Sequence, residues 1–158
     1  MKEYIKSLSE LRIEEIPWQC LSTPYGTGEM IPEMIKNKEI KKIGNLIEHQ
    51  STLWQVTPWT IWFLLKLPSA TYTTEEQEQL NDLIDTILFC CEEYDVANLT
   101  KDSIHNNPLH LLHSEYLWDD QIDSDLEWEK TEPRGYDQKT FASYYWYSRK
   151  FILDYQNK

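Results

Sequence analysis

The sequence has few glycines, few cysteines and no disulfide-like spacing. Its 158 residues include four glycines and three cysteines, Cys20, Cys90 and Cys91. The cysteines form no CxxC pair, and the adjacent two stand in an apolar run. We therefore expect small buried thiols and neither a disulfide framework nor a zinc knuckle. The scarcity of glycine disfavours strand-rich sandwiches and barrels and favours helices.

Long apolar runs are also missing. The longest near-continuous apolar stretch, residues 59–67, is interrupted by Thr60 and Lys66. It is far shorter than the roughly 20 residues that a membrane-spanning helix needs. The N-terminus mixes Lys2 with Glu3 and lacks the basic-then-apolar order of a secretory signal. We therefore expect a cytoplasmic protein that does not contact a membrane.

Basic residues are scarce in the second half of the chain. The net charge is −12, yet residues 1–50 hold seven basic and eight acidic residues. Residues 72–132 hold 17 acidic residues and only two basic ones. Direct nucleic-acid binding needs the opposite sign, because neutralised phosphates supply much of the affinity. The charge therefore favours a basic protein as partner, although solubility alone is the other interpretation.

The apolar periodicity predicts a single all-α domain over residues 1–158. The run at residues 57–67 is apolar nearly all round, so we place it at the centre of the core. Two antiparallel helix pairs and a final helix fit a HEAT-like stack or an irregular helical bundle. The expected helices are residues 2–10, 31–49 with Gly44 as either an early break or a tight packing point, 57–67, 73–97 with a Thr73/Glu76 capping box, 108–117 after Asn106 and Asn107, and 138–155 after an Asp137 cap.

An acidic stretch interleaved with tryptophans is the best candidate for an interaction surface. Large rigid aromatic side chains anchor protein interfaces, and carboxylates pair with Lys or Arg of a partner. Residues 144–147 add four consecutive aromatics, and these cannot all face one core. The predicted partner-binding residues are Glu115, Trp118, Asp119, Asp120, Asp123, Asp125, Glu127, Trp128, Glu129, Tyr144 and Tyr147.

Catalytic and metal-binding signatures are lacking. No GxSxG, HExxH or Cys-His pattern is present, and Gly26-Thr27-Gly28 lacks the residues that complete a phosphate loop. The nearest approach to a metal set is His105, His110 and His113 with Glu115, which we interpret as surface or capping residues. We expect no catalytic residue, no metal and no cofactor.

Three segments carry a family resemblance. Ile16-Pro17-Trp18, Thr23-Pro24-Tyr25-Gly26 and above all residues 47–59, IEHQSTLWQVTPW, resemble a group of bacterial HEAT-repeat-like proteins. Several of that group are similar to immunity partners of polymorphic or contact-dependent growth-inhibition toxins. The resemblance covers residues 16–67. It departs from the group at Thr27, where a basic residue tends to follow the Tyr-Gly pair.

Charge and resemblance together predict an immunity protein. We expect it to bind a cognate basic toxin domain, most simply a nuclease, and to cover the toxin's substrate cleft with the acidic surface between Glu115 and Glu132. One alternative is a small enzyme with Glu48 as base and His49 as acid. The blander interpretation of that pair is that it satisfies backbone groups at a helix end. A second alternative is a helical scaffold for another host protein.

Overall fold

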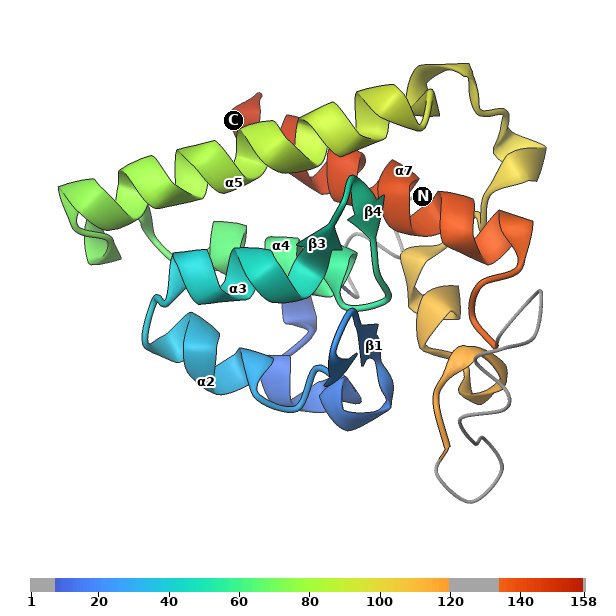
Figure 1. The fold of residues 1–158 in the computed structure, drawn as a ribbon, viewed down its shortest axis with the longest axis horizontal. Helices are drawn as coiled ribbons and strands as arrows, with labels where there is room; N and C mark the ends of the chain where they lie inside the picture. The colour runs from blue at the N-terminus through green and yellow to red at the C-terminus, as the bar shows by residue number, and fades with distance from the viewer. Residues whose placement is uncertain (1–7, 120–133, 158) are drawn as a thin grey trace.

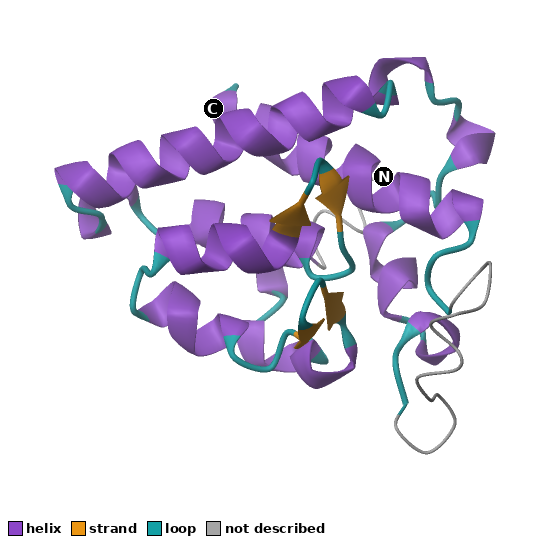
Figure 2. Ribbon diagram, in the orientation of Figure 1, coloured by secondary structure: helices purple, strands orange, loops and turns teal. Residues whose placement is uncertain are grey.

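The computed structural model describes residues 8–119 and 134–157, and the described chain is mostly helical (Figures 1 and 2). This confirms the prediction of a mainly helical fold. The α-helices are α2 (Ile31–Lys36), α3 (Ile40–Ile47), α4 (Thr57–Lys66), α5 (Thr74–Glu93) and α7 (Gln138–Gln156). The 3-10 helices are η1 (Ile13–Glu15), η2 (Trp18–Cys20), η3 (Ser69–Thr71), η4 (Val96–Asn98), η5 (Lys101–Ser103), η6 (Pro108–Leu112) and η7 (Ser114–Tyr116). Strands β1 (Ser22–Thr23), β2 (Gly26–Thr27), β3 (Glu48–His49) and β4 (Thr52–Leu53) form two hairpins.

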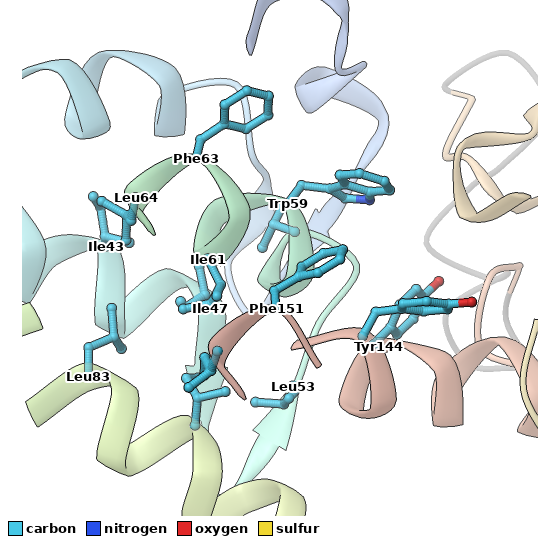
Figure 3. Packing of buried hydrophobic residues seen from close by; sticks show 14 of the residues in the cluster. Ile43, Ile47, Leu53, Trp59, Ile61, Phe63, Leu64, Leu83, Tyr144 and Phe151 are labelled. Carbon is cyan, nitrogen blue, oxygen red and sulfur yellow. The ribbon is translucent and has the colours of Figure 1, made fainter. Parts of the chain in front are cut away.

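Helix α4 lies at the centre of the core, as its sequence predicts. Seven of its ten residues are buried, and Trp59 is completely inaccessible. The Phe151 ring of α7 lies 6.4 Å from the Trp59 ring (Figure 3). It lies 5.0 Å from the Trp62 ring. Thr60 Oγ1 donates to the Val56 carbonyl, 2.8 Å away, so this buried hydroxyl is satisfied within the helix.

Helix α5 begins at the predicted capping box. The Glu76 amide donates to Thr73 Oγ1 at 3.1 Å, and the Thr73 amide donates to Glu76 Oε1 at 2.9 Å. The helix crosses the width of the molecule and buries one apolar stripe (Figure 1). It ends at Glu93 and not at Ala97, because Asp95 adopts a left-handed conformation with φ of 65° and the chain continues as η4.

The expected helix over residues 31–49 is two helices, α2 and α3. The break lies at Lys38, whose φ is 54°, and not at Gly44. The Lys38 amide donates to the Ile35 carbonyl at 3.1 Å and the Glu39 amide to the Met34 carbonyl at 3.0 Å. This pair of hydrogen bonds is a Schellman motif, which closes the C-terminus of α2. Gly44 is instead a packing point against Leu83 of α5.

The two hairpins were not predicted as strands. In β1–β2, Ser22 pairs with Thr27 and Thr23 with Gly26. In β3–β4 the turn residues Gln50 and Ser51 have φ values of 50° and 66°, which correspond to the tight turn that matches strand twist. The hairpin replaces the last two residues of the expected helix 31–49. The tips of the hairpins meet, since the rings of Tyr25 and His49 are 6.0 Å apart.

The helix expected after Pro108 is a pair of short 3-10 helices, η6 and η7, with Asn107 as the cap of the first. Asn107 Oδ1 accepts from the Leu109 amide at 2.9 Å. The segment is attached to α7 at His105, whose carbonyl accepts from Tyr147 Oη at 2.6 Å and whose amide donates to Ser143 Oγ at 2.9 Å. Helix α7 itself begins at the predicted Asp137 cap, which accepts from the Thr140 amide.

Candidate partner-binding site

The structure describes five of the eleven predicted partner-binding residues. These five are Glu115, Trp118, Asp119, Tyr144 and Tyr147. The other six lie outside the described residues and stay predictions: Asp120, Asp123, Asp125, Glu127, Trp128 and Glu129.

Tyr144 and Tyr147 were wrongly assigned to the surface. Each is only 1% exposed, because α7 contacts α4, α5 and three of the 3-10 helices, η4, η5 and η6. The Tyr144 hydroxyl donates to the Gly135 carbonyl at 2.5 Å, and burial raises the pKa of Tyr144 well above its ordinary value. Of the four consecutive aromatics, Trp146 is the one that is not fully buried.

Glu115 and Asp119 gather with a third carboxylate around one depression. This depression, of about 920 Å³, is lined by Glu29, Glu115 and Asp119, with Arg134 and Trp118 among its other walls. We call the three carboxylates and their depression the acidic basin. Glu29 follows β2, whereas Glu115 and Asp119 come from the segment that contains η7. Two regions far apart in sequence therefore build one negatively charged concave surface.

Backbone contacts hold the two halves of the basin together. The Trp118 amide donates to the Cys20 carbonyl at 2.9 Å, which joins the end of the 3-10 segment to the chain before β1. Arg134 Nη1 donates to the Leu117 carbonyl at 3.2 Å. Because these bonds fix main-chain positions, the backbone that carries the basin carboxylates is held in place.

Gln55 is buried and forms a polar junction between β1 and the segment that carries Glu115. Its Oε1 accepts from both the amide and the hydroxyl of Ser22, each at 2.9 Å. Its Nε2 donates to the Tyr116 carbonyl at 2.6 Å. The Ser22 hydroxyl also contacts the Tyr136 hydroxyl, and burial raises the pKa of Tyr136. We call this set the Gln55 junction, and it links β1 to the backbone beside Glu115.

An aromatic pocket adjoins the basin. This pocket, of about 380 Å³, is lined by Trp54, Trp118 and Pro24 with small residues of the first hairpin. Thr27 and Trp118 line both the aromatic pocket and the basin, so the two are neighbours. The Trp54 ring stands edge-on to the Tyr136 ring at 5.9 Å. Sequence reasoning missed Glu29, Arg134 and the site role of Trp54, although Trp54 stands inside the run that carries the family resemblance.

Glu48 and His49 form strand β3, next to the turn of the second hairpin. Glu48 Oε2 accepts from the Ser51 amide at 3.0 Å within the hairpin turn. Neighbouring strand residues point to opposite sides, so the two side chains diverge. The bland interpretation, in which Glu48 satisfies a backbone group, therefore has a direct counterpart in the structure, at a turn and not at a helix end.

The histidines and cysteines are placed as follows. The His110 ring lies 6.3 Å from that of His105 and 5.1 Å from that of His113. Within the described ranges, no group of three or more His, Cys, Asp or Glu side chains is arranged to hold a metal. Cys90 and Cys91 are buried free thiols, as predicted, and burial raises their pKa values to about 11 and about 12. Cys20 is only partly buried, so the prediction of a buried thiol is wrong there.

Comparison with known proteins gives no relative. No family model matches the chain, and neither a similar curated protein nor a similar solved structure is found. Among residues 8–119 and 134–157, no helix has the length and apolar character to cross a membrane.

Proposed function

We propose that this chain is an immunity protein that binds a cognate toxin domain, a nuclease, and covers its basic active-site cleft. The acidic basin carries the proposal, because Glu29, Glu115 and Asp119 converge from separate segments on one concave surface. A nuclease cleft is positively charged, since it must bind phosphates. Complementary potentials across an interface speed association and discriminate against wrong partners. The proposal includes a cytoplasmic location and a HEAT-like relation of the helices, both supported only by the sequence.

The charge balance around the basin supports a cationic partner. Three carboxylates line the basin together with the guanidinium of Arg134. Glu29 and Glu115 are exposed, so their carboxylates remain hydrated in the free protein and lose little solvation free energy on folding. A lysine or arginine of the partner gains a charge-assisted hydrogen bond when the complex excludes water from such a surface.

The test compares two triple variants that change the net charge equally. The first, Glu29→Gln/Glu115→Gln/Asp119→Asn, neutralises the basin. The matched control, Glu75→Gln/Glu78→Gln/Asp82→Asn, neutralises exposed or partly exposed carboxylates of α5. The probe is a purified basic nuclease domain, sought among the products of the genes that neighbour this one. Calorimetry should show binding weakened at least about tenfold by the basin variant and only slightly by the control.

Three results decide the proposal. A loss confined to the basin variant, together with loss of protection against the nuclease, supports it. Equal losses in both variants would mean that net charge alone attracts the partner, and the basin would not be the binding site. Unchanged binding in the basin variant, or a neighbouring domain that does not bind the wild-type protein, contradicts the proposal.

A further inference from the structure

The aromatic pocket beside the basin has a volume of about 380 Å³. It is lined by Trp54, Trp118 and Pro24, together with small residues of the first hairpin that include Thr27. Indole rings have electron-rich faces, which attract cations as well as apolar groups.

The backbone that carries the pocket walls is anchored within the protein. The Trp54 amide donates to Thr57 Oγ1 at 2.8 Å, and the Trp54 ring packs edge-on against Tyr136. The Trp118 amide donates to the Cys20 carbonyl, which anchors the main chain at the other wall. A pocket on an anchored backbone loses less conformational entropy on binding than one that must be assembled.

Continuity with the basin selects the occupant. The pocket and the basin share Thr27 and Trp118, and the basin contributes the carboxylates of Glu29, Glu115 and Asp119. An apolar side chain gains nothing from that neighbouring negative charge, whereas a cation does. Among cations, the guanidinium is planar and weakly hydrated, so it stacks on an indole better than an ammonium does. A second copy of this chain is disfavoured because the same negative surfaces would face each other.

We propose that the pocket between Trp54 and Trp118 receives an arginine side chain of the protein partner, while the acidic basin binds the surrounding basic residues. This inference rests on the proposed function and names the residue type that the partner inserts. In this arrangement the arginine stem lies against Pro24 and the guanidinium stacks on an indole ring, next to the carboxylates of the basin.

The test uses small probes in place of the unidentified partner. They are the N-acetyl, N-methylamide derivatives of arginine, lysine, citrulline and norleucine. Citrulline has the shape of arginine without its charge. Binding is followed through the indole N–H resonances of ¹⁵N-labelled protein, with Trp146 on α7 as the internal control. We expect saturable shifts of Trp54 and Trp118 with the arginine probe, about fivefold weaker binding of lysine, and no shift with citrulline.

Matched variants establish the site. Trp54→Leu should weaken arginine binding about fivefold, and Trp54→Phe should have an intermediate effect because it keeps a smaller ring. Trp146→Leu, a change on α7 outside the pocket lining, should bind the arginine probe normally. An unchanged spectrum away from the substituted residue shows that each variant is folded.

The outcomes separate this inference from the proposed function. Equal binding of citrulline, tighter binding of norleucine, or no response of Trp54 and Trp118 to arginine would each overturn the arginine pocket. If that occurs while the basin variant still loses the nuclease domain, only the pocket assignment is wrong. If arginine binds as expected but the basin variant retains full toxin binding, the pocket stands and the proposed function fails.

Discussion

The helical core buries large aromatic side chains, whereas the turn segment, residues 96–119, combines smaller buried side chains with directional hydrogen bonds. In the core, α4, α5 and α7 pack around large apolar side chains such as Trp59. The turn segment contains 3-10 helices and buries apolar side chains such as Leu111 in the same cluster. It is also held by hydrogen bonds, from α7 to the His105 carbonyl and from Gln55 to the Tyr116 carbonyl. Apolar burial is non-directional, whereas these bonds fix particular backbone atoms. The difference places the candidate site on a segment whose exact backbone position depends on a few directional contacts.

Truncating Trp59 should have the largest effect, because it is the largest completely buried side chain of the core. We expect Trp59→Ala to lower the free energy of unfolding by about 3–5 kcal/mol, from lost burial and the cavity left behind. Urea denaturation monitored by circular dichroism measures it. Trp59→Phe is the gentler comparison, since it keeps an aromatic ring beside Phe151 and removes an indole N–H that has no hydrogen-bond partner within the described structure. A loss from Trp59→Ala no larger than that from Trp59→Phe would contradict the central position of Trp59.

Gln55→Ala should loosen the attachment of the turn segment. It should lower the free energy of unfolding by less than Trp59→Ala does. It leaves the Ser22 amide and the Tyr116 carbonyl without their partner, and both lie at a buried junction. We expect a loss of roughly 2–4 kcal/mol, since each unsatisfied buried backbone group costs about 1–3 kcal/mol. Hydrogen exchange should become faster around Tyr116 than in α5. Gln77→Ala, which removes only an exposed side-chain bond to Asn81, is the control. Equal protection in both regions would show that the junction does not hold the segment.

The core helices could be predicted because their signals are local. The apolar run at 57–67, the Thr73/Glu76 box and the Asp137 cap each lie within a few residues of the structure they specify. The break at Lys38 and the turn at Gln50 and Ser51 could not, since residues with side chains adopt left-handed conformations there without the glycine that normally marks them. Local hydrogen bonds accompany these conformations, namely the Schellman pair at Lys38 and the bond from the Ser51 amide to Glu48.

Only part of the candidate site could be predicted from the sequence. Glu115, Trp118 and Asp119 were found from their charge and aromatic character, but nothing local links Glu29 or Trp54 to them. Their proximity arises from Trp118 binding the Cys20 carbonyl and Gln55 binding Tyr116. Tyr144 and Tyr147 were misassigned because four consecutive aromatics were expected to exceed one core, whereas α7 is covered by several neighbours.

Substitution of two glycines, one beside the turn segment and one in the helical core, should change the free energy of unfolding in opposite directions. At Gly135, φ is 82° and an added Cβ would lie 2.6 Å from the Tyr116 carbonyl oxygen and overlap Gln55, so Gly135→Ala should destabilise by about 1–3 kcal/mol. At Gly44 in α3, an added Cβ meets only Leu83 at 3.5 Å, so Gly44→Ala should stabilise by about 0.5–1 kcal/mol. Urea midpoints of the two variants measure both effects. Destabilisation by both would mean that α3 and α5 pack too closely for a methyl group.

The smallest effect should come from the titration of His105. Burial lowers the pKa of His105, and the charges of Lys139 and His110 add to this, while Asp137 and Glu115 oppose it. Thr140 Oγ1 donates to Asp137, so His105 Nε2 donates to Thr140 as a neutral imidazole. As the pH falls through the ordinary pKa of histidine, His105 therefore takes up a proton in the unfolded chain before it does so in the folded protein. The contribution of His105 to the free energy of unfolding is complete above about pH 6.5 and declines below it. His105→Gln retains the amide and carbonyl bonds to Ser143 and Tyr147, so it should flatten the decline in stability between pH 7.5 and pH 5.5, as measured by urea unfolding. An unchanged slope in His105→Gln would mean that other groups sense the acid and that His105 attaches the turn segment by its backbone alone.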